Sequence, residues 1–117
     1  MFIPMVESGA RALDAVFRAL GDPTRRRMLR ELAAGERTVG QLAEPFAMSL
    51  AAASKHVKAL EAAGLIRREV RWRTHVCRLD PGPLARARDW LAFYERFWSD
   101  RLLETEDAAQ PPTGSET

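Results

Sequence analysis

The segment of residues 49–66, SLAAASKHVKALEAAGLI, most narrowly limits what this chain can fold into. Within it, Ala53, Val57 and Leu60 recur at i, i+4 and i+7, a spacing that places them on one face of an α-helix. The segment begins with a serine, a favourable N-cap, and a glycine near its end is a favourable helix stop. Two lysines lie on the opposite side, so the pattern predicts a helix with one buried face and one cationic face.

A shorter helix is predicted directly before this segment. Thr38 and the glutamine three residues later form a capping box, and Val39 and Leu42 supply an apolar side. Pro45 cannot continue that helix comfortably, so the chain is expected to turn before the longer helix begins. A short helix, a tight turn and a second helix with one cationic face form the helix-turn-helix arrangement.

Two helices are expected ahead of this unit. The first carries Leu13, Val16 and Phe17 at helical spacing and ends at Gly21. The next begins at the Asp-Pro pair of residues 22–23, because aspartate caps a helix and proline loses no hydrogen bond at the first helical position.

The chain after the helix-turn-helix predicts a hairpin and a last helix. Two strand-like runs, residues 65–70 and 74–79, are joined by Arg-Trp-Arg and predict a wing with arginines at its tip. A Pro-Gly-Pro break at 81–83 precedes a long helix over residues 84–104. The fold class is therefore mainly α with a small β-hairpin wing (α+β), a winged helix-turn-helix with about five helices.

Length and composition limit the number of domains, the cellular compartment and the class of function that are expected. The 117 residues suffice for one domain with a modest core. A single cysteine allows no intrachain disulfide, and no signal peptide or membrane-length apolar run is apparent, so a cytoplasmic protein without a membrane partner is expected. No Ser-His-Asp set, phosphate loop or paired-carboxylate motif is present, and an enzyme is not expected.

Charge is concentrated around the cationic helix. Residues 49–80 carry seven Lys or Arg against three Asp or Glu, although the formal net charge of the whole chain is only +2. This pattern fits a polyanionic partner and a solvated charged face equally well. The helix-turn-helix favours the polyanion, because the major groove of duplex DNA admits one α-helix and neighbouring lysines neutralise phosphates.

Several stretches across about residues 13–84 resemble the ArsR/SmtB-type winged-helix repressors. They are LGDPTRRRMLREL, TVGQLAE, SKHVKALEAAGLI and THVCRLDP, in that order along the chain. The resemblance implies a homodimer that represses transcription by binding an inverted-repeat operator in double-stranded DNA and releases it on sensing a signal. The last helix, DWLAFYERFWSDRLLE, is similar to the branch of the family without a recognised metal site.

The domain organisation follows from these elements. Residues 1–9 are expected to form a flexible N-terminal arm, and residues 105–117 a disordered tail. Residues 10–104 form the winged helix-turn-helix DNA-binding domain, with a dimerisation helix over 84–104. The alternative is a winged-helix module that serves only protein–protein contacts, since this fold does not fix function.

DNA contact is expected from the outer face of the cationic helix, from its N-terminal turn and from the wing. The lysines would neutralise phosphates, the wing arginines would reach phosphates or the minor groove, and methyl groups would replace the polar base-reading residues of many relatives. The expected DNA-binding residues are Thr38, Ser49, Leu50, Ala51, Ser54, Lys55, Lys58, Arg71 and Arg73.

Dimerisation is expected through the last helix. Its aromatic residues cover more of the helix than one core stripe requires, and large unpartnered apolar area indicates a partner, most simply a second copy of the chain. The first helix is expected to pack beside it. The expected dimerisation residues are Leu13, Phe17, Trp90, Leu91, Tyr94, Phe97 and Trp98.

No metal site and no cofactor are expected. His75 and Cys77 share a strand face, but two ligands are too few for a closed zinc site. The third helix lacks the Cys and His ligands of metal-sensing relatives. An unidentified small molecule, or oxidation of Cys77, remains open as the signal.

Overall fold

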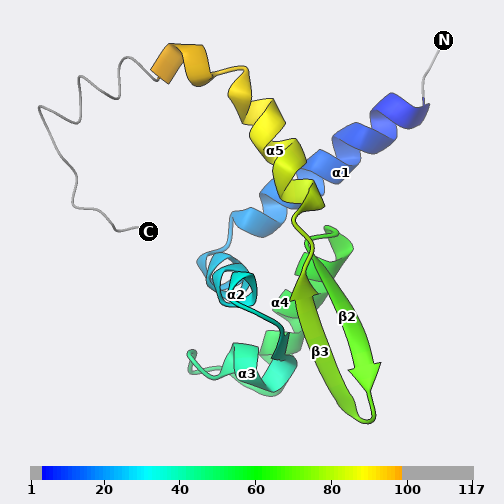
Figure 1. Ribbon diagram of the computed structural model, residues 1–117, viewed down its shortest axis with the longest axis vertical. Helices are drawn as coiled ribbons and strands as arrows, with labels where there is room; N and C mark the ends of the chain where they lie inside the picture. The colour runs from blue at the N-terminus through cyan, green and yellow to red at the C-terminus, as the bar shows by residue number, and fades with distance from the viewer. Residues whose placement is uncertain (1–3, 99–117) are drawn as a thin grey trace, which may run out of the picture. The chain divides into compact units, whose positions relative to one another are not determined.

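The computed structural model describes residues 4–98 of the chain (Figure 1). Within them the winged helix-turn-helix is confirmed, with five helices and a three-stranded sheet. The chain forms two compact units, Met1–Ala87 and Arg88–Thr117. The elements in order are α1 (Pro4–Leu20), α2 (Pro23–Ala33), β1 (Arg37–Thr38), α3 (Val39–Ala43), α4 (Leu50–Ala62), β2 (Ile66–Arg71), β3 (Thr74–Leu79) and α5 (Gly82–Ala92).

The boundary between the first two helices lies at the predicted stop and start signals. Helix α1 ends at Leu20, and α2 begins at Pro23 with Asp22 as its N-cap, whose carboxylate accepts the Arg25 backbone N–H at 3.1 Å. The start of α1 differs from expectation, because residues 4–9 are helical rather than a flexible arm. A proline in the first turn of a helix costs no hydrogen bond, so Pro4 is compatible with this earlier start.

Two hydroxyl caps build the helix-turn-helix. The Thr38 Oγ1 accepts the Gln41 N–H at 3.1 Å, and the Gln41 side chain accepts the Thr38 N–H at 2.8 Å, which completes the predicted capping box of α3. The Ser49 Oγ accepts the Ala52 N–H at 3.1 Å and caps α4. Satisfied N-terminal donors fix the residue at which each helix begins.

A Schellman motif ends α4 and directs the chain into the wing. Gly64 adopts φ +77°, the Leu65 N–H donates to the Leu60 carbonyl at 3.0 Å, and the Gly64 N–H donates to Glu61 at 2.9 Å. Leu60 and Leu65 are both fully buried, as is usual for the hydrophobic contact that accompanies this motif. The glycine stop inferred from sequence is thus also the residue that sets the exit direction.

The wing is a three-stranded antiparallel sheet rather than the isolated hairpin expected. Strand order is β1-β3-β2, with Thr38 opposite Val76 and Arg68 opposite Cys77. In Figure 1 the hairpin of β2 and β3 runs downward and has its turn at the free lower end. Strand β1 has only two residues, too short for any alternation to indicate it in the sequence.

One hydrophobic core joins the helices to the sheet. The inward residues of α4 are fully buried as predicted, and α1, α2 and α3 all contribute to the same cluster. Its largest fully buried side chains are Met28, Leu42, Leu60, Leu65, Val16, Val57 and Cys77. Among residues 4–98, no helix is both long enough and apolar enough to cross a membrane.

The expected continuous helix over residues 84–104 is wrong within the described residues. Helix α5 begins at Gly82 and ends at Ala92, residues 93–94 form a turn, and residues 95–98 are helical again. Tyr94 N–H donates to Leu91 at 2.9 Å, an i to i+3 bond that replaces the α-helical one. Aromatic residues lose rotamer freedom in a helix, and five of residues 90–98 are aromatic. Residues 99–104 and the expected disordered tail of 105–117 lie outside the described residues.

Truncation of a core residue of α4 tests the packing. Leu60→Ala should lower the free energy of unfolding by about 2–5 kcal/mol, because the side chain is fully buried and its loss leaves a cavity. Lys55→Ala, on the exposed side of the same helix, should change it by less than about 0.5 kcal/mol. Urea unfolding followed by far-ultraviolet circular dichroism measures both, and equal effects would contradict the assigned faces.

Candidate nucleic-acid interface

The outer face of α4 is a cationic surface on a rigid support. Lys55 and Lys58 are exposed, and neither forms an ion pair within the described part of the chain. Ala51 is exposed on the same helix, and Ser54 is half-buried. The opposite side of α4 is locked into the core, so this face is presented with little freedom to reorient.

The first turn of α4 combines a cap with an exposed apolar side chain. Ser49 is exposed, but its hydroxyl accepts a backbone hydrogen bond and so defines the helix start. Thr38 does the same for α3. Leu50 is 60% exposed and forms the apolar end of the surface. Methyl groups in such a position are suited to contact the C5-methyl group of thymine.

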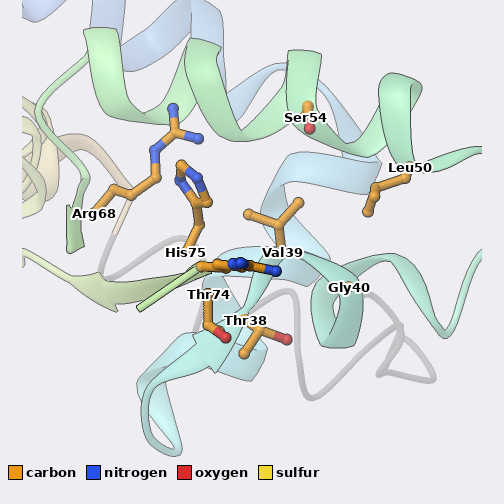
Figure 2. A pocket seen from close by; sticks show the side chains of 9 residues that line it. Thr38, Val39, Gly40, Leu50, Ser54, Arg68, Thr74 and His75 are labelled. Atoms are coloured by element: carbon orange, nitrogen blue, oxygen red, sulfur yellow. The ribbon is translucent and has the colours of Figure 1, made fainter. Parts of the chain in front are cut away.

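A groove of about 420 Å³ lies between the helix-turn-helix and the wing (Figure 2). Figure 2 shows Leu50 and Ser54 on α4, with Thr38 and Val39 across the groove from them. Of the nine predicted residues, the groove brings together Thr38, Leu50, Ser54 and Arg73, whereas Ser49, Ala51, Lys55, Lys58 and Arg71 do not line it. The remaining lining residues are Val39, Gly40, Arg68, Thr74 and His75.

Sequence reasoning did not assign Arg68 and His75 to this interface. Arg68 lies two positions after the buried Ile66 in β2, so the two side chains share the face of the sheet that is turned toward the helices. Strand pairing places Arg68 opposite Cys77. The Arg68 Nη2 donates to the Glu61 Oε1 at 2.6 Å, which ties the wing to α4. The period-2 pattern from Ile66 could have indicated Arg68, but only the strand register identifies its partner.

Arg71 is held by carboxylates. Its Nη1 and Nη2 donate to Glu36 at 2.8 and 3.2 Å, and its Nη2 also donates to Glu69 at 3.0 Å. These hydrogen bonds, first those to Glu36 and then that to Glu69, raise the pKa of Arg71 above its ordinary value. Hydrogen bonding to Arg71 also lowers the pKa of Glu36 and of Glu69, so all three groups are charged at neutral pH. A DNA phosphate must compete with both carboxylates for this arginine.

Arg73 is the wing arginine without such a restraint. It lines the groove, and no ion pair holds it within residues 4–98. Trp72 and Arg73 are the two residues between the last paired positions of β2 and β3, so they form the hairpin turn. The two wing arginines, which the sequence pattern does not distinguish, therefore differ in how readily they can reach a ligand.

The expected dimerisation residues fall into two groups. Leu13 and Phe17 are half-buried and pack against the core of their own unit, which leaves only part of their surface for a partner. Within residues 90–98 the expected large apolar side chains are all exposed, between 37% for Trp98 and 54% for Phe97. Phe93, outside the predicted set, is 56% exposed, and its ring meets Tyr94 edge-on at 4.8 Å.

Cys77 and His75, the two residues considered for metal binding or redox chemistry, differ in burial. Cys77 is fully buried, and burial raises the pKa of its thiol above the ordinary value, which disfavours the reactive thiolate. His75 is exposed in the groove on the same strand face. Within the described residues, no three side chains of the His, Cys, Asp or Glu types come together to hold a metal ion.

Comparison with known proteins decides the family. Residues 20–69 match the model of a family described as a helix-turn-helix domain. The HTH-type transcriptional regulator Rv2034 of Mycobacterium tuberculosis is 38% identical over 92 residues, which cover 79% of this chain and 83% of the relative. The crystal structure of an ArsR family transcriptional regulator, RHA00566, is also 38% identical, covers 76% of this chain and 92% of its own, and superposes with a TM-score of 0.71. The chain belongs to the ArsR family of transcriptional regulators.

A second relative of this ArsR-family protein matches a shorter stretch. The transcriptional repressor SdpR of Bacillus subtilis is 41% identical over 54 residues, covering 46% of this chain and 60% of the relative. A helix-turn-helix domain in a transcriptional regulator is a DNA-binding domain, so DNA is the ligand class against which the cationic surface is tested.

The difference between the two wing arginines yields a quantitative expectation. Arg73→Ala should weaken binding to duplex DNA more than Arg71→Ala, because Arg71 can reach a phosphate only by breaking its ion pairs with Glu36 and Glu69. The measurement is fluorescence anisotropy of a labelled duplex of about 30 base pairs titrated at several salt concentrations. A larger loss for Arg71→Ala would contradict the smaller contribution assigned to Arg71.

Proposed function

We propose that this ArsR-family regulator is a homodimeric repressor that binds an inverted-repeat operator with α4 in the major groove and the wing along the flanking backbone. The proposal rests on α4, whose exposed lysines face outward from a helix anchored by the fully buried Ala53, Val57 and Leu60. A helix that reads DNA must be held rigidly and must present charge at the phosphates on either side of the groove.

Repression is supported by the relative SdpR, which is named a transcriptional repressor and aligns over 54 residues. The physical basis is occupancy, since a protein bound across a promoter excludes other proteins from the same DNA. No chemical step is required of the regulator. Release then needs only a signal that lowers affinity for DNA.

Sequence selectivity by one α4 is expected to be weak. Ser54 is the one predicted base-reading side chain of α4 with a hydroxyl not used in its cap, and Leu50 and Ala51 offer only methyl groups. Methyl contacts favour thymine but leave the hydrogen-bonding edges of the bases unread. A genome offers so many competing sites that a regulator of this type needs two half-sites read together, about one helical turn or a multiple of it apart.

The aromatic surface of residues 90–98 is the proposed dimer contact. Phe93 and Phe97 are more than half exposed, and the Arg96 guanidinium lies 4.9 and 5.1 Å from their ring centroids. Several large apolar side chains exposed together on one short segment favour contact with a protein partner over contact with water. A second copy supplies an identical surface of matching chemistry, and a twofold dimer would match the symmetry of an inverted repeat.

A winged helix that binds only proteins is the competing function. It predicts no dependence of duplex binding on the lysines of α4. Electrostatic contact with DNA instead predicts a linear fall of log affinity with log salt concentration, with a slope set by the number of phosphates neutralised. The two functions therefore differ in a single titration.

The double substitution Lys55→Ala and Lys58→Ala tests DNA binding. It should weaken specific and nonspecific duplex binding alike and reduce the salt slope by about 2, because each lysine neutralises one phosphate. The matched control is Arg18→Ala with Arg30→Ala, which removes the same charge from exposed positions on α1 and α2. Equally weakened binding in both variants would reduce the effect to net charge, and unchanged affinity in a folded lysine variant would contradict the docking of α4.

Phe97→Ala tests the dimer contact. If the ring is buried by a second copy, its removal should weaken association by about 3 kcal/mol, more than a hundredfold in the dissociation constant. Sedimentation equilibrium at micromolar concentration should then show monomer, and operator binding should fall with the α4 surface intact. Arg88→Ala, a change of an exposed charged residue in the same unit, is the control. A wild-type chain that sediments as a monomer would exclude this model.

A further inference from the structure

Trp72 has the most exposed large apolar side chain among the described residues. Its exposed fraction is 93%, and it is the first residue of the two-residue turn at the tip of the wing. Its φ is +63°, and it is the one residue other than glycine with a positive φ within residues 4–98. An indole at this position contributes almost no buried area to folding.

The backbone of this turn is better suited to glycine than to tryptophan. A positive φ at the first turn residue is a feature of the tight hairpins in which glycine is preferred, because a Cβ atom clashes there. The bulky side chain therefore costs free energy in the folded state. Within the described chain Trp72 has no aromatic or cation–π partner that would offset this cost.

The surroundings of Trp72 are cationic and adjoin the groove. Arg71 and Arg73 flank it in sequence, and Arg73 and Thr74 line the same groove as Leu50 and Ser54 of α4. Val70, two residues earlier, is 58% exposed and lies opposite His75, another lining residue. The tip is thus continuous with the proposed DNA surface, and its charge complements a polyanion.

We propose that Trp72 is a minor-groove contact, with its indole packed against sugar and base edges beside the major groove occupied by α4. This inference rests on the proposed DNA binding. The major groove is bounded by phosphate backbones with a minor groove beyond each, and apolar side chains placed there can partly unstack a base step. A protein surface is a poorer match, because arginines flank Trp72 on both sides in sequence and Val70 is the one other exposed large apolar residue of the hairpin.

Three substitutions separate the aromatic ring from the backbone strain. Trp72→Ala removes the ring and keeps a Cβ, Trp72→Phe keeps an aromatic ring, and Trp72→Gly removes both ring and strain. Affinity is measured by fluorescence anisotropy on the tightest duplex selected from a random pool. Trp72→Ala and Trp72→Gly should both bind about tenfold more weakly, whereas Trp72→Phe should stay close to wild type. Trp72→Gly should also raise Tm, since the strain is relieved.

Indole fluorescence gives an independent measurement. Addition of duplex should quench part of the wild-type tryptophan emission, and that part should be missing in Trp72→Phe, because packing against base edges brings the indole into contact with the nucleobases. Wild-type affinity in Trp72→Ala, or equally weakened binding in Trp72→Phe, would overturn the role of the ring. A lower Tm for Trp72→Gly would overturn the strain argument.

The lysine variant of α4 keeps this inference distinct from the proposed function. If Lys55→Ala with Lys58→Ala weakens DNA binding while Trp72→Ala does not, DNA binding stands and the wing-tip contact fails. If neither substitution changes the affinity, both the docking of α4 and the wing-tip contact fail. Weaker binding in both variants supports both the proposed function and the wing-tip contact.

Discussion

The left-handed backbone at Gly64 is the constraint on which the arrangement of α4 and the wing depends. A side chain at φ +77° would be strained, and the two Schellman hydrogen bonds require this conformation to form. They accompany the full burial of both Leu60 and Leu65 in the core. The direction in which the wing leaves α4 is thereby set within three residues of the end of the helix.

The sheet extends this constraint to the rest of the wing. Strand β3 lies between β1 and β2, and the Asp80 N–H donates to the Leu65 carbonyl at 2.8 Å where the wing returns to the core. Because Thr38 pairs with Val76, the residue that caps α3 is also part of the sheet. Helix-turn-helix and wing therefore form one hydrogen-bonded body, and the groove between them has a fixed lining.

Most of the fold could be predicted from short local patterns in the sequence. The rest depends on contacts between strands that are far apart in the sequence, and local patterns do not reveal these. Caps at Asp22, Thr38 and Ser49 and the glycine stop act within four residues, so the sequence shows them directly. The two-residue β1 and the place of Arg68 in the groove depend on strand partners distant in the sequence, and the turn at residues 93–94 interrupts an otherwise helical pattern. Among the candidate site residues, the helical periodicity already places the lysines of α4 on the exposed face. The ion pairs of Arg71 could be identified only from the three-dimensional structure.

Those ion pairs give the wing an internal substitute for a nucleic-acid backbone. Glu36 and Glu69 present carboxylate oxygens to Arg71 much as two phosphates of a duplex would, at distances of 2.8–3.2 Å. In the free protein the charge of this arginine is already balanced by Glu36 and Glu69. A polyanion therefore gains little attraction from Arg71 until both carboxylates are displaced. If the wing contacts DNA as proposed, Arg71 would therefore add little to the attraction for random DNA, and its charge would reach a phosphate only in a complex whose other contacts are already made.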